Sequence, residues 1–85
     1  MQKTFIIKNP TGLHARPAAE LVKKASLFPC TVSLIKNEKK VNAKSIISVL
    51  SLGVSQNEQV IVAAEGEQAA EALQAVTSFF ESLVE

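Results

Sequence analysis

The sequence lacks several residue types on which common catalytic and metal sites depend. It contains no Asp, Tyr or Trp, and it has one Cys (Cys30), one His (His14) and one Arg (Arg16). Without Asp, a Ser-His-Asp triad cannot form, and one Cys with one His cannot supply the several ligands of a zinc site. A single Cys also excludes an internal disulfide, which favours a reducing, cytoplasmic location. We therefore expect neither a metal site nor a bound cofactor.

The chain has neither a large charge excess nor a long apolar run. Nine basic side chains against eight acidic ones leave a formal net charge of +1, which is too small to indicate a nucleic-acid-binding protein. No uncharged apolar run approaches the roughly 20 residues that span a bilayer, so membrane insertion is not expected. With 47% hydrophobic residues among 85, the composition predicts a single globular domain over residues 1–85.

The spacing of apolar residues predicts seven elements in the order β-α-β-β-α-β-α. Strands are predicted where apolar and polar positions alternate: residues 1–8, 31–35, a short strand around Val41, and 59–65. Helices are predicted from between residues 14 and 17 to near 26 or 27, over 46–52, and over 69–83. This order predicts an α+β open-faced sandwich, with three helices on one face of a four-stranded antiparallel sheet. The fourth strand should lie between the first and second.

The residues that carry chemistry are concentrated where the first helix begins, in Gly12-Leu13-His14-Ala15-Arg16-Pro17. Backbone N–H groups and the positive end of the helix dipole form an anion site there, and Arg16 adds a permanently charged donor for phosphate oxygens. A neutral imidazole nitrogen of His14 is a nucleophile. The arrangement predicts a histidine that accepts phosphate. The alternative is that His14 is a polar helix cap and Arg16 a solvated surface charge.

Two separated motifs carry a family resemblance. The string Gly12-Leu13-His14-Ala15-Arg16-Pro17-Ala18-Ala19 resembles the active-site signature of the histidine-containing phosphocarrier (HPr) family of the bacterial phosphoenolpyruvate:sugar phosphotransferase system (PTS). The string Lys44-Ser45-Ile46-Ile47-Ser48-Val49-Leu50-Ser51-Leu52-Gly53 resembles that family's second signature, around a regulatory serine. Length and element order agree over essentially the whole chain.

The resemblance implies a carrier, not an enzyme. In that family the histidine takes a phosphoryl group on Nδ1 from phosphorylated enzyme I and passes it to sugar-specific IIA proteins or domains. Carried over to this chain, His14 is the phosphoacceptor, and Arg16 stabilises the phosphate with help from the backbone N–H groups of Ala15 and Arg16. Glu85 ends the chain where family members of this length place a terminal carboxylate near the arginine.

Ser45 has two compatible interpretations. As a helix N-cap, its hydroxyl accepts a backbone N–H, which stabilises the helix by about 0.5–2 kcal/mol relative to Ala. Resemblance to HPr of low-GC Gram-positive bacteria implies phosphorylation by HPr kinase/phosphorylase, with a catabolite-control transcription regulator as a further partner. Those sequences typically read Ile-Met-Gly-Val-Met after the serine. This one reads Ile46-Ile47-Ser48-Val49-Leu50, so Ser48 stands where glycine is usual.

The resemblance also implies a docking patch for transient partners of a monomeric carrier. Ile46 and Ile47 would lie beside His14, surrounded by Ala15, Ala19, Lys23 and Ser51. Exposed apolar groups rimmed by charge suit a short-lived interface. Core packing is the alternative for Ile47, Val49 and Leu50.

Three rival functions remain open from the sequence. A hydrolase using His14 as general base would lack an Asp to orient the ring. An RNA-binding module would stack bases on sheet aromatics, but the predicted open face carries only Thr4, Ile6, Thr31, Ser33 and Ile35. The third rival is a regulatory or nitrogen-branch paralogue with other partners, although regulatory paralogues of the Gram-positive type lack the phosphoacceptor histidine.

Overall fold

The computed structural model describes residues 1–83 and contains the seven expected elements in the expected order. Their bounds are β1 (Gln2–Ile6), α1 (Ala15–Ala25), β2 (Thr31–Lys36), β3 (Lys39–Asn42), α2 (Ile46–Leu52), β4 (Gln59–Glu65) and α3 (Ala69–Ser82). β1 is shorter than the predicted residues 1–8 because its pairing with β4 ends at Ile6, so Ile7 lies outside the strand. Its N–H donates instead to the Glu58 carbonyl at 3.0 Å, and its own carbonyl accepts from Asn57 N–H.

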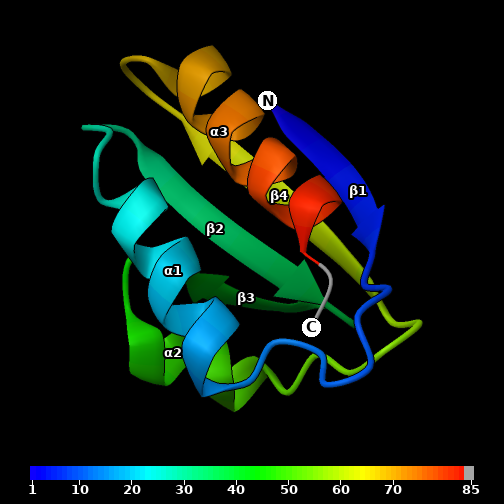
Figure 1. The fold of residues 1–85 in the computed structure, drawn as a ribbon. Coiled ribbons are helices and arrows are strands. Elements are labelled where there is room, and N and C mark those ends of the chain that lie inside the picture. Colours follow the sequence, from blue (N-terminus) through cyan, green and yellow to red (C-terminus); the bar gives the residue numbers. More distant parts are fainter. Residues whose placement is uncertain (84–85) are drawn as a thin grey trace.

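The four strands form one antiparallel sheet in the order β1-β4-β2-β3, so β4 lies between β1 and β2 as predicted. In the register, Thr4 faces Ile61 across β1 and β4, while Leu34 of β2 faces Val62 on one side and Val41 on the other. Figure 1 shows α1 and α3 over the same face of this sheet, and α2 beside α1 near β3.

The core fills the space between the sheet and the helices. Alternate residues of the two central strands, Val32, Leu34, Val60 and Val62, are fully buried there. Leu21 of α1 and Val76 of α3 close over them with no exposed surface. The period of two in the strands and the helical spacing in α1 and α3 thus select the same face of the sheet. This packing fixes the first turn of α1 relative to the sheet.

The other face of the sheet carries no aromatic side chain. All four Phe residues lie in or against the helix-side core, and Phe5 of β1 stacks on Phe80 of α3 with ring centroids 5.8 Å apart. Of the predicted open-face residues, Thr4, Ile6 and Thr31 are exposed and Ile35 is half-buried. Ser33 lies on this face too, since it alternates with the core residues Val32 and Leu34, but it is only 5% exposed because its small side chain lies on a central strand between Ala63 and Asn42.

Candidate functional site

His14 is the N-cap residue of α1. Its backbone is extended (φ −94°, ψ −167°), and its carbonyl accepts the first intrahelical hydrogen bond, from Ala18 N–H at 2.9 Å. Its imidazole makes no capping hydrogen bond, and the residue is exposed. The alternative in which the His14 ring serves as the helix cap is therefore wrong for this structure. The ring is accessible to a large partner.

The first turn of α1, directly after His14, carries a cationic side chain and backbone N–H groups at the helix N-terminus. Ala15 and Arg16 precede the first intrahelical donor, Ala18, so their amides belong to the positive end of the helix. Both residues are exposed. Pro17 is buried and has no N–H, which costs nothing at this position of a helix. The first turn contains no acidic residue, so no carboxylate on that turn competes with an incoming anion.

The loop before His14 is held tightly on its inner side. Asn9 is 2% exposed, and its side-chain Nδ2 donates to the Gly12 carbonyl at 2.8 Å. The backbone carbonyl of Asn9 accepts from Gly12 N–H at 3.1 Å. Gly12 has φ +65°, and a Cβ there would overlap the Val54 carbonyl oxygen and lie 2.9 Å from Ser55 Cα. Glycine is therefore required at this position by both conformation and space. This close approach allows Leu13 N–H to donate to the Val54 carbonyl at 3.0 Å.

A charged pair that the sequence analysis did not identify holds the segment on which Leu13 rests. Lys36 Nζ lies 2.9 Å from Glu58 Oε1 and donates to the Gly53 carbonyl at 2.7 Å. Glu58 Oε1 also accepts from Ser55 N–H at 2.7 Å. The hydrogen bond from Lys36 lowers the pKa of the Glu58 carboxyl, and the Ser55 N–H contributes to the same shift. The two residues are 22 positions apart, so no local pattern could have indicated the pair.

Ser45 caps α2 as predicted. Its hydroxyl oxygen accepts from Ser48 N–H at 3.3 Å, and its own backbone is extended. The helix ends at Leu52, followed by Gly53 in the left-handed conformation (φ +67°). Ser45 is half-buried. Its side chain is thus part of a helix terminus and still reaches the surface.

The residues predicted to form the docking patch are all exposed. In α2, Ile47 is 77% exposed and Ile46 39%, whereas Val49 of the same helix is completely buried. Core packing is therefore excluded for Ile47 and correct for Val49, while Leu50, 40% exposed, is not a core residue either. The remaining exposed members are Ala15, Ala19 and Lys23 of α1 and Ser51 of α2. α1 and α2 pack against each other (Figure 1), which brings the two groups to neighbouring helices.

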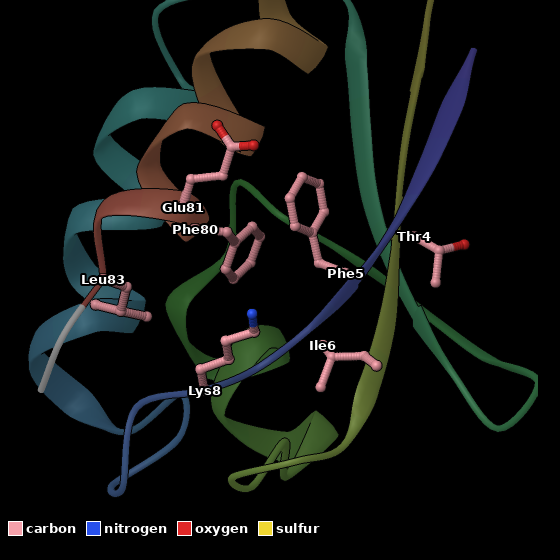
Figure 2. Close-up of a pocket in the computed structure, with 7 residues that line it drawn as sticks. All are labelled: Thr4, Phe5, Ile6, Lys8, Phe80, Glu81 and Leu83. Atoms are coloured by element: carbon pink, nitrogen blue, oxygen red, sulfur yellow. The ribbon is translucent and has the colours of Figure 1, made fainter.

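A surface pocket of about 460 Å³ lies elsewhere, between β1 and the end of α3. Figure 2 shows the Phe5 and Phe80 rings at its centre, with Lys8 and Glu81 near its edge. It contains none of the predicted site residues. Glu85, the last predicted one, falls outside the described residues. Within residues 1–83 there is no cluster of three metal-ligating side chains, and no helix there is long and apolar enough to cross a membrane.

Comparison with known proteins gives the same assignment over nearly the whole chain. The family model "PTS HPr component phosphorylation site" matches residues 1–82. HPr from Thermoanaerobacter tengcongensis is 50% identical, with a TM-score of 0.93 over 96% of this chain and 92% of that one. The phosphocarrier protein HPr of Bacillus anthracis is 36% identical, with a TM-score of 0.89 over 94% and 95%. The catabolite repression protein Crh of Bacillus subtilis, described as a domain-swapped dimer, is 41% identical, with a TM-score of 0.80 over 100% and 98%. This chain belongs to the HPr phosphocarrier family of the PTS.

Proposed function

We propose that His14 is the phosphoacceptor of this carrier, taking a phosphoryl group from phosphorylated enzyme I and passing it to IIA proteins or domains. The observation that carries the proposal is the placement of the chain's one histidine, exposed and not used as a cap, at the N-terminus of α1. Its neighbour Arg16, the one arginine, lies in the same turn. Membership of the HPr family supports a carrier role in place of substrate turnover.

The transfer needs little from the chain beyond positioning and charge. A lone pair on the neutral His14 ring, at Nδ1 by family resemblance, forms the new bond to phosphorus. The bond from phosphorus to its donor atom on enzyme I breaks, and the bonding electrons stay with enzyme I. Charge on the three equatorial oxygens is stabilised by the Arg16 guanidinium and by the amides of Ala15 and Arg16 at the positive end of α1. Transfer to IIA repeats the step with His14 as the donor.

The test is incubation with enzyme I and phosphoenolpyruvate, followed by intact-mass measurement. One acid-labile phosphate is expected on the wild-type chain and none on His14→Ala. Arg16→Ala is expected to fold normally, because Arg16 is exposed, and to accept phosphate more slowly. Labelling of His14→Ala equal to that of the wild type would show that another residue is the acceptor.

The exposed residues of α1 and α2 supply the surface for both partners. Ile46 and Ile47 form its apolar centre, with Ala15 and Ala19 beside them. Lys23 and Ser51 form the polar rim. A small patch of this kind supports rapid association and release, which a relay between two proteins requires.

Phosphorylation of Ser45 is proposed as the regulatory step, by HPr kinase/phosphorylase and with a catabolite-control transcription regulator as the reader. A phosphate adds about −1.5 to −2 charges at the N-terminus of α2, where the helix dipole tolerates them. Enzyme I would have to desolvate this charge when it covers Ile46 and Ile47. Ser45→Asp is therefore expected to retain its melting temperature and to be phosphorylated more slowly on His14. A large loss of melting temperature with unchanged docking would leave Ser45 as a cap alone.

The chain is proposed to act as a monomer, one HPr domain over residues 1–85 in the cytoplasm, without nucleic-acid or membrane binding. The described fold has its own complete core, which supports a monomer. Because Crh is described as a dimer, the oligomeric state of this chain should be measured by light scattering. A regulatory or nitrogen-branch paralogue is the second candidate. Failure of a sugar-branch IIA to accept the phosphate from phosphorylated His14 would favour it.

A further inference from the structure

The segment between α2 and β4 supports the loop that carries His14. Figure 1 shows this segment passing beside the loop between β1 and α1. Backbone hydrogen bonds join the two: Leu13 N–H to the Val54 carbonyl at 3.0 Å, Ile7 N–H to the Glu58 carbonyl at 3.0 Å, and Asn57 N–H to the Ile7 carbonyl. The position of Val54 is therefore coupled by a direct hydrogen bond to Leu13, the residue directly before His14.

Lys36 and Glu58 hold this segment from the side of the sheet. Lys36, the last residue of β2, donates hydrogen bonds to the Gly53 carbonyl and to the Glu58 carboxylate. The same carboxylate accepts a hydrogen bond from Ser55 N–H. The side chain of Lys36 is only 16% exposed and that of Glu58 36%. Solvent therefore screens this pair less than it screens a fully exposed one.

One peptide group connects the charged pair to the site. The N–H of the Val54–Ser55 peptide donates to Glu58, and the C=O of the same peptide accepts from Leu13. The described backbone contains no cis peptide, so these two groups point in opposite directions. A charge-assisted bond on the N–H side fixes the peptide plane and strengthens the carbonyl as an acceptor on the other side.

We propose that the Lys36–Glu58 ion pair positions His14 through the Val54–Ser55 peptide group. The inference rests on the proposed role of His14 as phosphoacceptor. Lys36 and Glu58 are positioning residues, since neither is expected to touch the phosphoryl group. Loss of the pair should slow the transfer step at saturation while leaving docking unchanged, because Ile46 and Ile47 lie at the opposite end of α2 from Gly53.

The chain offers a matched control in Lys44. Its Nζ donates to the Phe28 carbonyl at 2.7 Å, the same kind of bond and the same length as the bond from Lys36 to Gly53. Phe28 follows the C-terminal end of α1, whereas His14 precedes its N-terminal end. The 11 residues of α1 separate them by about 16 Å. Lys44→Met thus removes an equivalent bond away from the phosphoacceptor loop.

The experiment compares Lys36→Met, Glu58→Gln and Lys44→Met with the wild type in two assays. Amide hydrogen exchange reports the Leu13 N–H bond without any partner protein. Phosphorylation by enzyme I, at several concentrations of the chain, separates kcat from KM. Lys36→Met is expected to speed Leu13 exchange and to lower kcat, each by about threefold or more, with KM within twofold. Glu58→Gln keeps an acceptor oxygen but loses the charge, so its effect should be smaller and in the same direction. Lys44→Met should change neither the Leu13 exchange rate nor kcat.

Equal behaviour of Lys36→Met and Lys44→Met in both assays would overturn the proposal. An unchanged kcat with a raised KM would overturn it too, because the pair would then act on docking. If enzyme I fails to phosphorylate even the wild type, the proposed function is wrong, and the Leu13 exchange rates alone decide whether the pair holds the loop.

Discussion

Replacing Gly12 by alanine should destabilise the protein more than the same change at Gly53, although the two glycines have nearly the same positive φ. Their φ values are +65° and +67°. The left-handed conformation costs an alanine about 1–2 kcal/mol relative to glycine at either position. What differs is space, since a Cβ at Gly53 meets nothing within 4 Å.

At Gly12 the added methyl overlaps the Val54 carbonyl oxygen, which is the acceptor for Leu13 N–H. Leu13 is 4% exposed, so water cannot easily replace the lost partner, and an unsatisfied buried N–H costs about 1–3 kcal/mol. The expected destabilisation is about 2–5 kcal/mol for Gly12→Ala and about 1–2 kcal/mol for Gly53→Ala.

Thermal unfolding measures the difference. For a domain of this size, 1 kcal/mol corresponds to about 4–8 °C in melting temperature. Gly12→Ala should therefore melt at least about 8 °C below the wild type, and below Gly53→Ala. Urea titration at 25 °C gives the two free energies of unfolding directly. Equal losses in the two variants would refute the reasoning, because they would show that the contact with Val54 contributes nothing beyond backbone strain.

Further predictions concern the surface, the charged pair and the core. Ile47→Ser should leave the free energy of unfolding within about 0.5 kcal/mol of the wild type and weaken association with enzyme I, measured by calorimetry. Leu27→Ser, equally exposed at 75%, is the control, and weakening by both changes would argue against a localised patch. The Glu58 carboxyl should titrate below its ordinary pKa of 4.5 in an NMR titration, and Lys36→Met should move this pKa back up. Because folding lowers this pKa, the stabilisation is present above the unfolded-state pKa and disappears as pH falls through the folded-state value. A midpoint unaffected by Lys36→Met would contradict the pairing. Leu34→Ala, at a fully buried position, should cost about 2–5 kcal/mol in urea unfolding, and a loss below 1 kcal/mol would contradict its place in the core.

The fold was predictable because its local and long-range signals agree. Val60, Val62 and Ala64 recur at every second position of β4 and have no exposed surface, whereas Gln59 and Glu65 at the ends of the strand are exposed. Ser45 and Gly53 mark the two ends of α2 through capping preferences that act over a few residues. Alternation and capping preferences involve only a few neighbouring residues, so the order of helices and strands could be inferred from the sequence.

The long-range contacts that hold the loop before His14 could not be predicted in the same way. His14 and Arg16 were identifiable as a rare pair at a helix start. Lys36 and Glu58, by contrast, look like ordinary surface charges in a linear sequence, and they become partners only when β2 and the segment after α2 are brought together. The end of β1 at Ile6 depends on the same tertiary event, since Ile7 bonds to the loop before β4.

The strand order determines when, during synthesis, the loop that carries His14 can reach its final geometry. β1, the first strand made, has its pairing partner in β4 at residues 59–65, and the loop before His14 rests on residues 54–58. A nascent chain that has exposed α1, β2 and β3 therefore already contains its histidine but has nothing to hold β1 or the loop in place. Closing so long a stretch of chain is slow compared with forming a helix or a hairpin. The acceptor loop is expected to acquire its final geometry only after β4 has left the ribosome, so an incomplete chain stalled before that point would carry His14 in a loop that is not yet fixed for phosphoryl transfer.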